Sequence, residues 1–314
     1  MEYYFAPMEG ITDAVYRKIH REFFPGIDRY YTPFLSPNQN RKFSTKELRE
    51  ILPEWNAGMP LVPQLLGKDT GDFLWAAEEI AALGYTEVNL NLGCPSGTVT
   101  AKKKGAGMLE DPEELDRFLD IVCRAMPVKL SVKTRLGMHE PEEFVRILRI
   151  YNRYPISEVI LHPRTRPELY KGQVHLDWYG YALEHSMHPV CYNGDLRTGA
   201  DVAGLTEQFP ETETVMIGRG LVADPALVRE IRTGKGLTKE ELFRFHEALF
   251  EAYSSVFGSA QSAVPRMKEI WSYLIRWFEN AERVEKALRK ASRRDDFSLA
   301  VEQVRSLKFR KPVL

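Results

Sequence analysis

Short apolar runs alternate with amphipathic segments along the first three quarters of the chain. Runs rich in β-branched and aromatic residues, bounded by glycine, proline or polar clusters, are typical of strands, and apolar residues at helical spacing are typical of helices. The predicted strands are residues 3–8, 28–32, 61–66, 87–92, 128–134, 158–162, 189–193 and 214–218. The predicted helices that follow them are residues 13–22, 44–52, 69–83, 112–125, 141–153, 177–185, 199–206 and 225–233.

This regular alternation predicts an α/β fold, a (β/α)8 or TIM barrel over residues 1–237. A doubly wound open sheet uses the same units and is the main structural alternative. The candidate functional residues fall at the carboxyl ends of different strands, and only in a barrel do these ends converge on one mouth. These residues are Met8, Gln64, Asn91, Lys133, His162, Asn193 and Gly218. No GxGxxG segment follows the first strand, so the dinucleotide-binding fingerprint of open sheets is absent.

From about residue 238 the pattern changes to helices alone. The first of these begins after Thr238 and repeats apolar residues at Leu242, Phe245 and Leu249, which is helical spacing. We expect further helix starts at Pro265 and Asp295. The pattern therefore predicts a separate all-α helical domain over residues 238–314, after the barrel in the sequence.

One cysteine occupies a position suited to chemistry. Val88, Leu90 and Leu92 alternate with polar residues in a short strand, and Cys94 follows immediately between Gly93 and Pro95. Glycine permits a tight turn and proline fixes its own φ, so the thiol is presented in one direction. A free cysteine is more often a packing residue, and the local sequence alone leaves that alternative open.

The segments that carry the candidate chemistry resemble those of one family, in the same order and over nearly the whole chain. They are APMEGITD (6–13), PQLLG (63–67), NLGCPSG (91–97), SVKTRLG (131–137), HPRT (162–165), NGD (193–195) and MIGRG (216–220). Together they strongly resemble the tRNA-dihydrouridine synthases. The resemblance implies an FMN-dependent enzyme with a TIM barrel and a C-terminal helical domain that helps to bind tRNA.

Glycine-rich turns follow the last two predicted strands, where this fold usually binds phosphate. Either turn alone is typical of an ordinary tight turn, but both together with an arginine favour a bound phosphate, which by resemblance belongs to FMN. The turn residues are Asn193, Gly194 and Asp195 in one, and Gly218 and Arg219 in the other.

The rest of the expected flavin site comes from other strand ends. A flavin needs a cation near N1 and the C2 carbonyl, because hydride uptake leaves negative charge there, and Lys133 is the candidate. Gln64 and Asn91 can hydrogen-bond the pyrimidine edge of the flavin or the substrate. His162 matches a family histidine that contacts FMN, although it is also compatible with a core histidine. The segment expected beneath the flavin comprises Ala6, Pro7 and Met8.

The resemblance assigns the reaction as well. Saturating the C5–C6 bond of uracil needs a hydride at C6, from reduced FMN, and a proton at C5. A cysteine thiol with an ordinary pKa of roughly 8.5 is mostly protonated at neutral pH and can donate that proton. The resemblance gives this role to Cys94, with NADPH or NADH as the transient electron donor. Cys123 and Cys191 are expected to pack.

The expected partner is tRNA, and the target uridine is expected in its D-loop, where leaving the stack costs less than in a duplex. A ring of cations around the barrel mouth would suit this polyanion, although three consecutive lysines are also typical of a solvated loop. The expected RNA contacts, besides Asn91, are Lys102, Lys103, Lys104, Arg135, Arg164 and Arg166.

Charge and cysteine usage agree with this picture without defining it. The net charge is −1, but residues 239–314 hold 15 Lys and Arg against 11 Asp and Glu. Three widely spaced cysteines argue against a disulfide framework and for a reducing compartment, so we expect a cytoplasmic protein. No secretion signal or membrane span is predicted, no metal site is expected, and the chain is expected to be a monomer.

Two other functions are compatible with part of the sequence. Another FMN barrel reductase, such as a dihydroorotate dehydrogenase, would act on a free pyrimidine and does not need a basic helical appendage. An RNA-binding module without activity would not require Cys94, Lys133 or the two glycine-rich turns. The residues favour the synthase over both.

Overall fold

The computed structural model describes residues 1–311, and contacts divide this chain into two compact units. Unit 1 comprises Met1–Pro7, Asp28–Asp195 and Ala203–Ile217. Unit 2 comprises Met8–Ile27, Leu196–Val202 and the described chain from Gly218 onward. Unit 2 thus includes early segments as well as the C-terminal helices, and the functional boundary at residues 237/238 stays a prediction.

Unit 1 is built on a closed parallel sheet. Its strands are β1 (Glu2–Phe5), β2 (Arg29–Tyr31), β3 (Leu61–Val62), β4 (Gln64–Leu65), β5 (Glu87–Leu92), β6 (Lys129–Arg135), β7 (Ile156–His162), β8 (Val190–Tyr192) and β9 (Thr214–Ile217). The order is β3-β2-β1-β9-β8-β7-β6-β5-β4, with every neighbouring pair parallel.

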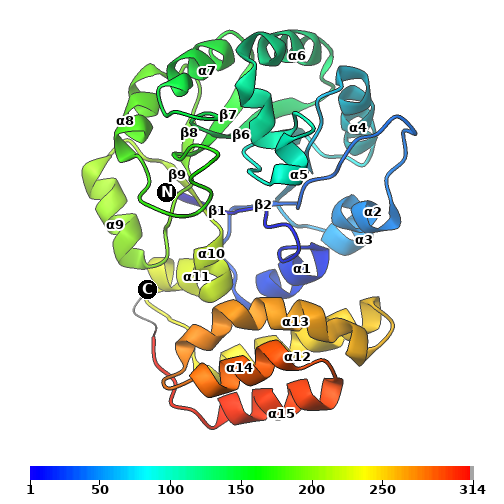
Figure 1. The fold of residues 1–314 in the computed structure, drawn as a ribbon, viewed down its shortest axis with the longest axis vertical. Coiled ribbons are helices and arrows are strands. Elements are labelled where there is room, and N and C mark those ends of the chain that lie inside the picture. Colours follow the sequence, from blue (N-terminus) through cyan, green and yellow to red (C-terminus); the bar gives the residue numbers. More distant parts are fainter. Residues whose placement is uncertain (312–314) are drawn as a thin grey trace. The chain divides into compact units, whose positions relative to one another are not determined.

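The two end strands of this order are halves of one strand. Only Pro63 separates β3 from β4, and proline has no N–H to donate to the ladder. Because β3 pairs with β2 and β4 pairs with β5, the sheet closes on itself as a TIM-like barrel. The predicted fold class is therefore confirmed (Figure 1).

Helices of unit 1 follow the strands in the expected alternation. They are α2 (Thr45–Ile51), α3 (Pro53–Asn56), α4 (Thr70–Ala82), α5 (Gly97–Thr100), α6 (Pro112–Ala125), α7 (Glu143–Tyr151) and α8 (Leu176–His185), with the 3-10 helix η1 (Gly105–Glu110) before α6. Asp69 and Asp111 cap α4 and α6 by accepting hydrogen bonds from Asp72 N and Glu114 N. Figure 1 shows α4, α6, α7 and α8 on the outside of the strands. The short α3, α5 and η1 were not predicted.

The barrel interior is an apolar cluster with one thiol. It is formed by Tyr4, Ala6, Tyr31, Val62, Ile160, Cys191 and Met216. Cys191 is fully buried, and burial raises the pKa of its thiol well above the ordinary value. The inner face of the strands therefore forms a packed core beneath the mouth.

Below this core, at the amino ends of the strands, lies a buried carboxyl group. Glu158 is 6% exposed, and its Oε1 accepts a hydrogen bond from Tyr4 Oη at 3.2 Å. Its Oε2 is buried without a hydrogen-bond partner among the described residues. Burial raises the pKa of Glu158 to about 7, although nearby Arg29 opposes the shift and Glu87 reinforces it.

We expect this carboxyl to make stability depend on pH. Its folded pKa lies above the unfolded value, so its contribution is complete below the unfolded pKa and is lost as the pH rises through about 7. The loss is at most about 3 kcal/mol. Glu158→Gln, which mimics the protonated form, should flatten the fall in urea midpoint between pH 5 and pH 8. Glu213→Gln, at an exposed position beside the same end of the barrel, is the control. An unchanged pH slope in Glu158→Gln would contradict this assignment.

Unit 2 is helical. Its helices are α1 (Ala14–Phe23), α10 (Arg219–Ala223), α11 (Leu227–Thr233), α12 (Lys239–Val256), α13 (Ala260–Leu274), α14 (Glu282–Lys290) and α15 (Arg294–Arg305), with the 3-10 helix η2 (Ile275–Trp277). The helix α9 (Gly199–Gln208) has residues in both units. The helices expected after residue 238 are present as α12–α15. None of the helices within residues 1–311 is long and apolar enough to span a membrane.

The helix α1 packs on α12 within unit 2. Phe245 of α12 contacts Tyr16 edge-on at 5.8 Å between ring centroids and Phe24 at 5.1 Å. Tyr253 Oη donates a hydrogen bond to Asp13 Oδ1 at 2.8 Å. The α12 face predicted from the apolar spacing is therefore buried, and part of its partner comes from the first residues of the chain.

One predicted helix start is wrong. The helix α13 begins at Ala260 rather than Pro265, because the Ser259 side chain accepts from Ser262 N and caps it. Pro265 lies inside the helix. Its missing N–H removes one hydrogen bond of the helix without ending it.

Candidate active site

The loop after β5 holds Cys94 from both sides. Asn91 Oδ1 accepts hydrogen bonds from Gly93 N at 3.1 Å and Cys94 N at 2.9 Å. The Cys94 carbonyl accepts from Ala106 N at 3.1 Å. The thiol is part of a half-buried residue, so it is both positioned and accessible.

A glycine beneath Cys94 makes this approach possible. Gly105 has φ +57°, and a Cβ on it would lie 2.9 Å from both Cys94 Cβ and the Cys94 carbonyl oxygen. Any side chain at this position would displace the cysteine or the turn. Sequence reasoning missed this residue, although the run GAG after three lysines was a signal for a tight turn.

Buried amides connect three neighbouring strands below the loop. Gln64 Nε2 donates to Asn89 Oδ1 at 2.8 Å, and Asn91 Nδ2 donates to Gln64 Oε1 at 2.8 Å. Asn89 Nδ2 donates to Ser131 Oγ at 2.9 Å. Gln64 and Asn91 were predicted to face a ligand, and the structure adds that they orient each other and the Cys94 loop. Asn89 was missed, although its spacing of two from Asn91 places both on one face of β5.

Lys133 lies next to this network. It is opposite Asn91 in the register of β5 and β6. Burial lowers the pKa of Lys133 to about 8, with a further lowering by Arg135, while Cys191 and Cys94 act in the opposite direction. Its ammonium has neither a hydrogen bond nor an ion pair to any of residues 1–311. Lys133 is half-buried, and a cation withdrawn from water in this way without a carboxylate is costly unless a ligand supplies an acceptor.

Two of the residues predicted to contact RNA, Arg135 and Arg164, are buried and hold neighbouring loops. Arg135 is 1% exposed and donates to the carbonyls of Gly93 at 2.9 Å, Thr165 at 3.0 Å and Leu169 at 2.7 Å. Arg164 is fully buried and pairs with Asp195 at 2.6 Å. Both guanidinium groups are thus directed at partners inside the protein. Their role in the structure is to fix the loops around the mouth.

The loop after β7 carries an aromatic residue that sequence reasoning also missed. Tyr170 is 53% exposed, and its ring stacks on His162 at 6.0 Å between centroids. Arg135 lies 5.2 Å from the same ring. His162 itself is 7% exposed and faces Arg164 through Nε2. The only sequence signal for Tyr170 as an exposed aromatic residue was the polar loop that contains it.

The turn after β8 is shaped by a close contact. A Cβ on Gly194 would lie 2.8 Å from Tyr192 Oη and 2.9 Å from Val174 Cγ1, so only glycine fits. Asn193 Nδ2 donates to the Met216 carbonyl at 2.7 Å, and Asp195 pairs with Arg164. Because Arg164 neutralises Asp195, the turn keeps an environment compatible with an anion.

The remaining predicted residues fall into separate groups. Ala6 is buried in the barrel core and Pro7 follows it, whereas Met8, Gly218 and Arg219 belong to unit 2. Gly218 precedes the first turn of α10. Lys102 and Lys103 are exposed and Lys104 is half-buried. Arg166 donates to Thr100 Oγ1 at 3.4 Å.

Within residues 1–311 no group of three or more His, Cys, Asp or Glu side chains is arranged to hold a metal ion. The mouth of the barrel brings together one thiol, one ammonium that is unpaired among residues 1–311 and a set of buried amides. Such a set belongs to a barrel enzyme that handles a proton and a developing negative charge.

Comparison with known proteins agrees with the motifs. The model of the dihydrouridine synthase (Dus) family matches residues 4–308, so the chain belongs to that family and is a dihydrouridine synthase. It is 29% identical over 294 residues to the tRNA-dihydrouridine(16) synthase of Pseudomonas putida, covering 90% of both chains. It is 32% identical over 239 residues to that of Aquipseudomonas alcaligenes, covering 74% of this chain and 75% of the relative.

Solved structures support the fold. Morphinone reductase, in complex with tetrahydroNAD, superposes with a TM-score of 0.54 at 12% sequence identity. The match covers 78% of this chain and 90% of that one. At this identity the likeness concerns the barrel alone.

Proposed function

We propose that the chain reduces the C5–C6 double bond of a D-loop uridine in tRNA, with FMN as cofactor and Cys94 as proton donor. The observation that carries the proposal is that a positioned thiol and a half-buried ammonium, unpaired among residues 1–311, lie at one barrel mouth. The relatives named for tRNA support the substrate. Bound FMN would supply a hydride to C6, and NADPH or NADH would restore its electrons.

The residues present fit a flavin. Lys133 lacks an acceptor among the described residues, and a flavin ring offers its N1 and C2 carbonyl oxygen as acceptors. The turn at Asn193 and Gly194 and the one at Gly218 and Arg219 are the proposed phosphate contacts. Ala6, Pro7, Met8, Gln64 and His162 remain proposed flavin neighbours.

Cys94 would complete the reaction on the base. Its S–H bond breaks as a C–H bond forms at C5, which leaves a thiolate. Lys133 and Cys94 interact electrostatically, so the ammonium that holds the flavin would also stabilise this thiolate. Asn91 keeps the cysteine in place through the two backbone hydrogen bonds described above.

A direct assay tests the whole proposal. The purified protein, supplied with FMN, NADPH and tRNA transcripts, should form dihydrouridine that is detected by nuclease digestion and mass spectrometry. The relatives named for position 16 make that uridine the first to map. A protein that cannot be loaded with FMN, or that forms no dihydrouridine when loaded, would refute the proposal.

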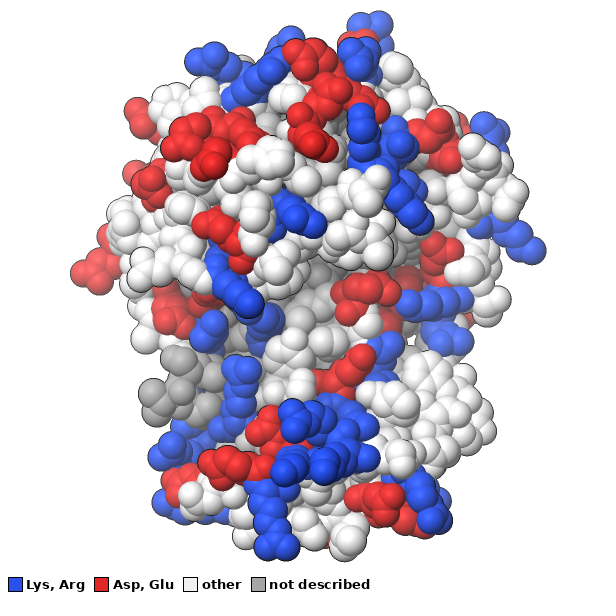
Figure 2. Space-filling model, in the orientation of Figure 1, with Lys and Arg blue, Asp and Glu red and all other residues white. Residues whose placement is uncertain are grey.

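A cluster of unpaired cations supports tRNA docking by unit 2. Within residues 283–294 none of the six exposed Lys and Arg side chains forms an ion pair with the described chain. They are Arg283, Lys286, Arg289, Lys290, Arg293 and Arg294. The carboxylates in and next to this stretch, Glu282, Glu285, Asp295 and Asp296, lie in the first turns of α14 and α15, where they complement the helix dipoles. Figure 2 shows Lys and Arg gathered over α14.

We expect this cluster to contribute salt-dependent affinity. The double variant Arg289→Ala/Lys290→Ala should bind tRNA more weakly, and its slope of log affinity against log salt should fall by about 2. The matched control is Arg117→Ala/Arg149→Ala, which removes two exposed cations from α6 and α7. Filter binding at several salt concentrations measures both. Equal slopes in the two double variants would exclude the cluster as a docking surface.

A further inference from the structure

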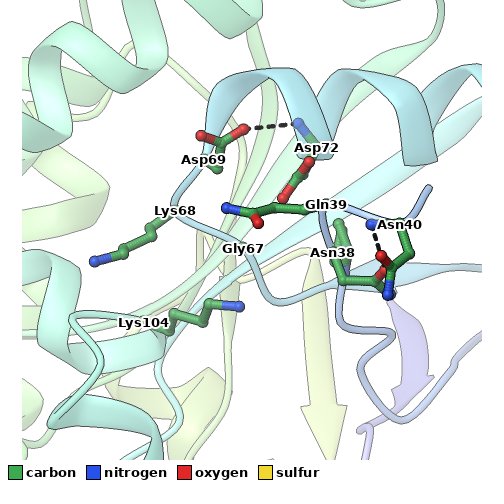
Figure 3. A pocket seen from close by; sticks show the side chains of 9 residues that line it. Asn38, Gln39, Asn40, Gly67, Lys68, Asp69, Asp72 and Lys104 are labelled. Atoms are coloured by element: carbon green, nitrogen blue, oxygen red, sulfur yellow. Dashed lines mark hydrogen bonds between the residues drawn. The ribbon is translucent and has the colours of Figure 1, made fainter. Parts of the chain in front are cut away.

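A polar pocket opens at the rim of unit 1, and no step of the mechanism uses it. Its volume is about 480 Å³. Its walls come from the loop after β2 with Asn38 and Gln39, the turn after β4 with Lys68, the first turn of α4 with Asp72, and the Cys94 loop with Lys104 (Figure 3). Because β2, β3/β4 and β5 are neighbours, these segments lie side by side at the barrel mouth.

Consecutive residues of one loop connect the pocket to the reactive thiol. Lys104 immediately precedes Gly105, the residue that packs against Cys94 without room for a Cβ. Ala106 N donates to the Cys94 carbonyl. When the target uridine lies at Cys94, the nucleotide next to it in the RNA chain is therefore brought to this part of the rim.

Several side chains of the pocket have unused hydrogen-bonding capacity. Lys68 and Lys104 form no ion pair with residues 1–311, and the side chains of Gln39 and Asp72 make no hydrogen bond to them. In Figure 3 the carboxylate of Asp72 lies beside the side chain of Gln39, whereas Lys104 extends across the view below them and Lys68 points to the other side. Asp69 differs, because its Oδ1 accepts from Asp72 N at 2.9 Å as the cap of α4.

We propose that this pocket binds the nucleotide adjacent to the reduced uridine and favours guanine there, an inference that rests on the proposed function. A carboxylate has two acceptor oxygens, and guanine alone among the RNA bases presents two adjacent donors, N1–H and the 2-amino group. The ammonium groups complement O6 or the linking phosphate. Bases outside a stack are read on this Watson–Crick edge.

The test varies the base and the carboxylate together. In tRNA transcripts with a mapped target, each neighbour of the uridine is set in turn to guanosine, inosine or adenosine. Inosine lacks only the 2-amino group of guanosine. At one of the two neighbours, single-turnover dihydrouridine formation by the wild type should slow about tenfold from guanosine to inosine. Asp72→Asn should already be slow with guanosine and should slow little further with inosine.

Matched variants keep the result interpretable. Asp69→Asn makes the same charge change in the same pocket and retains a capping side chain, so it should keep the guanosine preference. Lys104→Ala should raise KM for tRNA, whereas Lys129→Ala, which removes an exposed lysine at the amino end of β6, should not. Flavin content and NADPH-dependent bleaching report intact folding in each variant.

Two outcomes would overturn the pocket alone. One is a wild-type rate that ignores the base at both neighbours, and the other is an Asp72→Asn variant with the full guanosine preference. Either would leave the proposed reaction standing, because the wild type still forms dihydrouridine. If the loaded wild type forms none with any transcript, the proposed function fails and the pocket assignment fails with it.

Discussion

Cys94→Ala should form dihydrouridine 10²- to 10⁴-fold more slowly than the wild type, the range typical for loss of a general acid. The same variant should keep nearly normal bleaching of FMN by NADPH, because that step needs no proton from this thiol. The backbone hydrogen bonds to Asn91 and Ala106 do not involve the sulfur, so the loop should keep its shape. Stopped-flow absorbance and single-turnover analysis of tRNA measure the two halves separately.

Controls for this result come from the other cysteines. Cys123→Ala and Cys191→Ala should change stability without separating the two half-reactions, and Cys191 is enclosed in the barrel core. Normal product formation by the Cys94 variant would show that another group or water donates the proton. Loss of bleaching in that variant would place Cys94 in flavin binding instead.

Lys133→Met should have opposite effects on stability and on function. Methionine has a similar length and no charge, so it removes the desolvation cost of an ammonium that lacks a partner among residues 1–311. Without flavin, the variant should therefore melt at a higher temperature than the wild type. With NADPH and FMN, its flavin reduction should slow by about 10²- to 10³-fold, since the cation no longer stabilises charge that develops on the ring.

Lys129→Met is the matched control for this substitution. It changes the same residue type at the exposed start of the same strand, β6. It should alter neither the rate of flavin reduction nor the rise in melting temperature on adding FMN. A Lys133→Met protein that melts lower without flavin would show that the ammonium is satisfied inside the barrel. A normal reduction rate would remove Lys133 from the cofactor site.

Local signals predicted the elements well where caps and turns are encoded nearby. The strand at 87–92 and the helix at 112–125 have the predicted bounds, since glycines flank the strand region and Asp111 caps the helix with Pro112 at its first position. Pro63 was read through as part of one strand, although it divides β3 from β4. The start of α13 was misplaced because a proline is a stronger sequence signal than the serine that caps the helix.

The site could be predicted in its chemistry but only partly in its geometry. Gly93 and Pro95 identified Cys94 as a presented thiol, and the strand ends identified Lys133 and Asn91. The burial of Arg135 and Arg164 was not foreseen, because their charge suggested a surface contact with RNA. Their donors are used by carbonyls and an acid from distant loops, and sequence spacing does not reveal such partners.

The packing of α1 against α12 has a consequence for biosynthesis. Tyr16 and Phe24 leave the ribosome long before Phe245, the aromatic ring that covers them in the finished protein. At about 5–20 residues per second, the interval is on the order of tens of seconds. During that time α12, which covers the apolar face of α1 in the finished protein, has not yet been synthesised. Slow translation or truncation before α12 should therefore make the emerging chain dependent on chaperones.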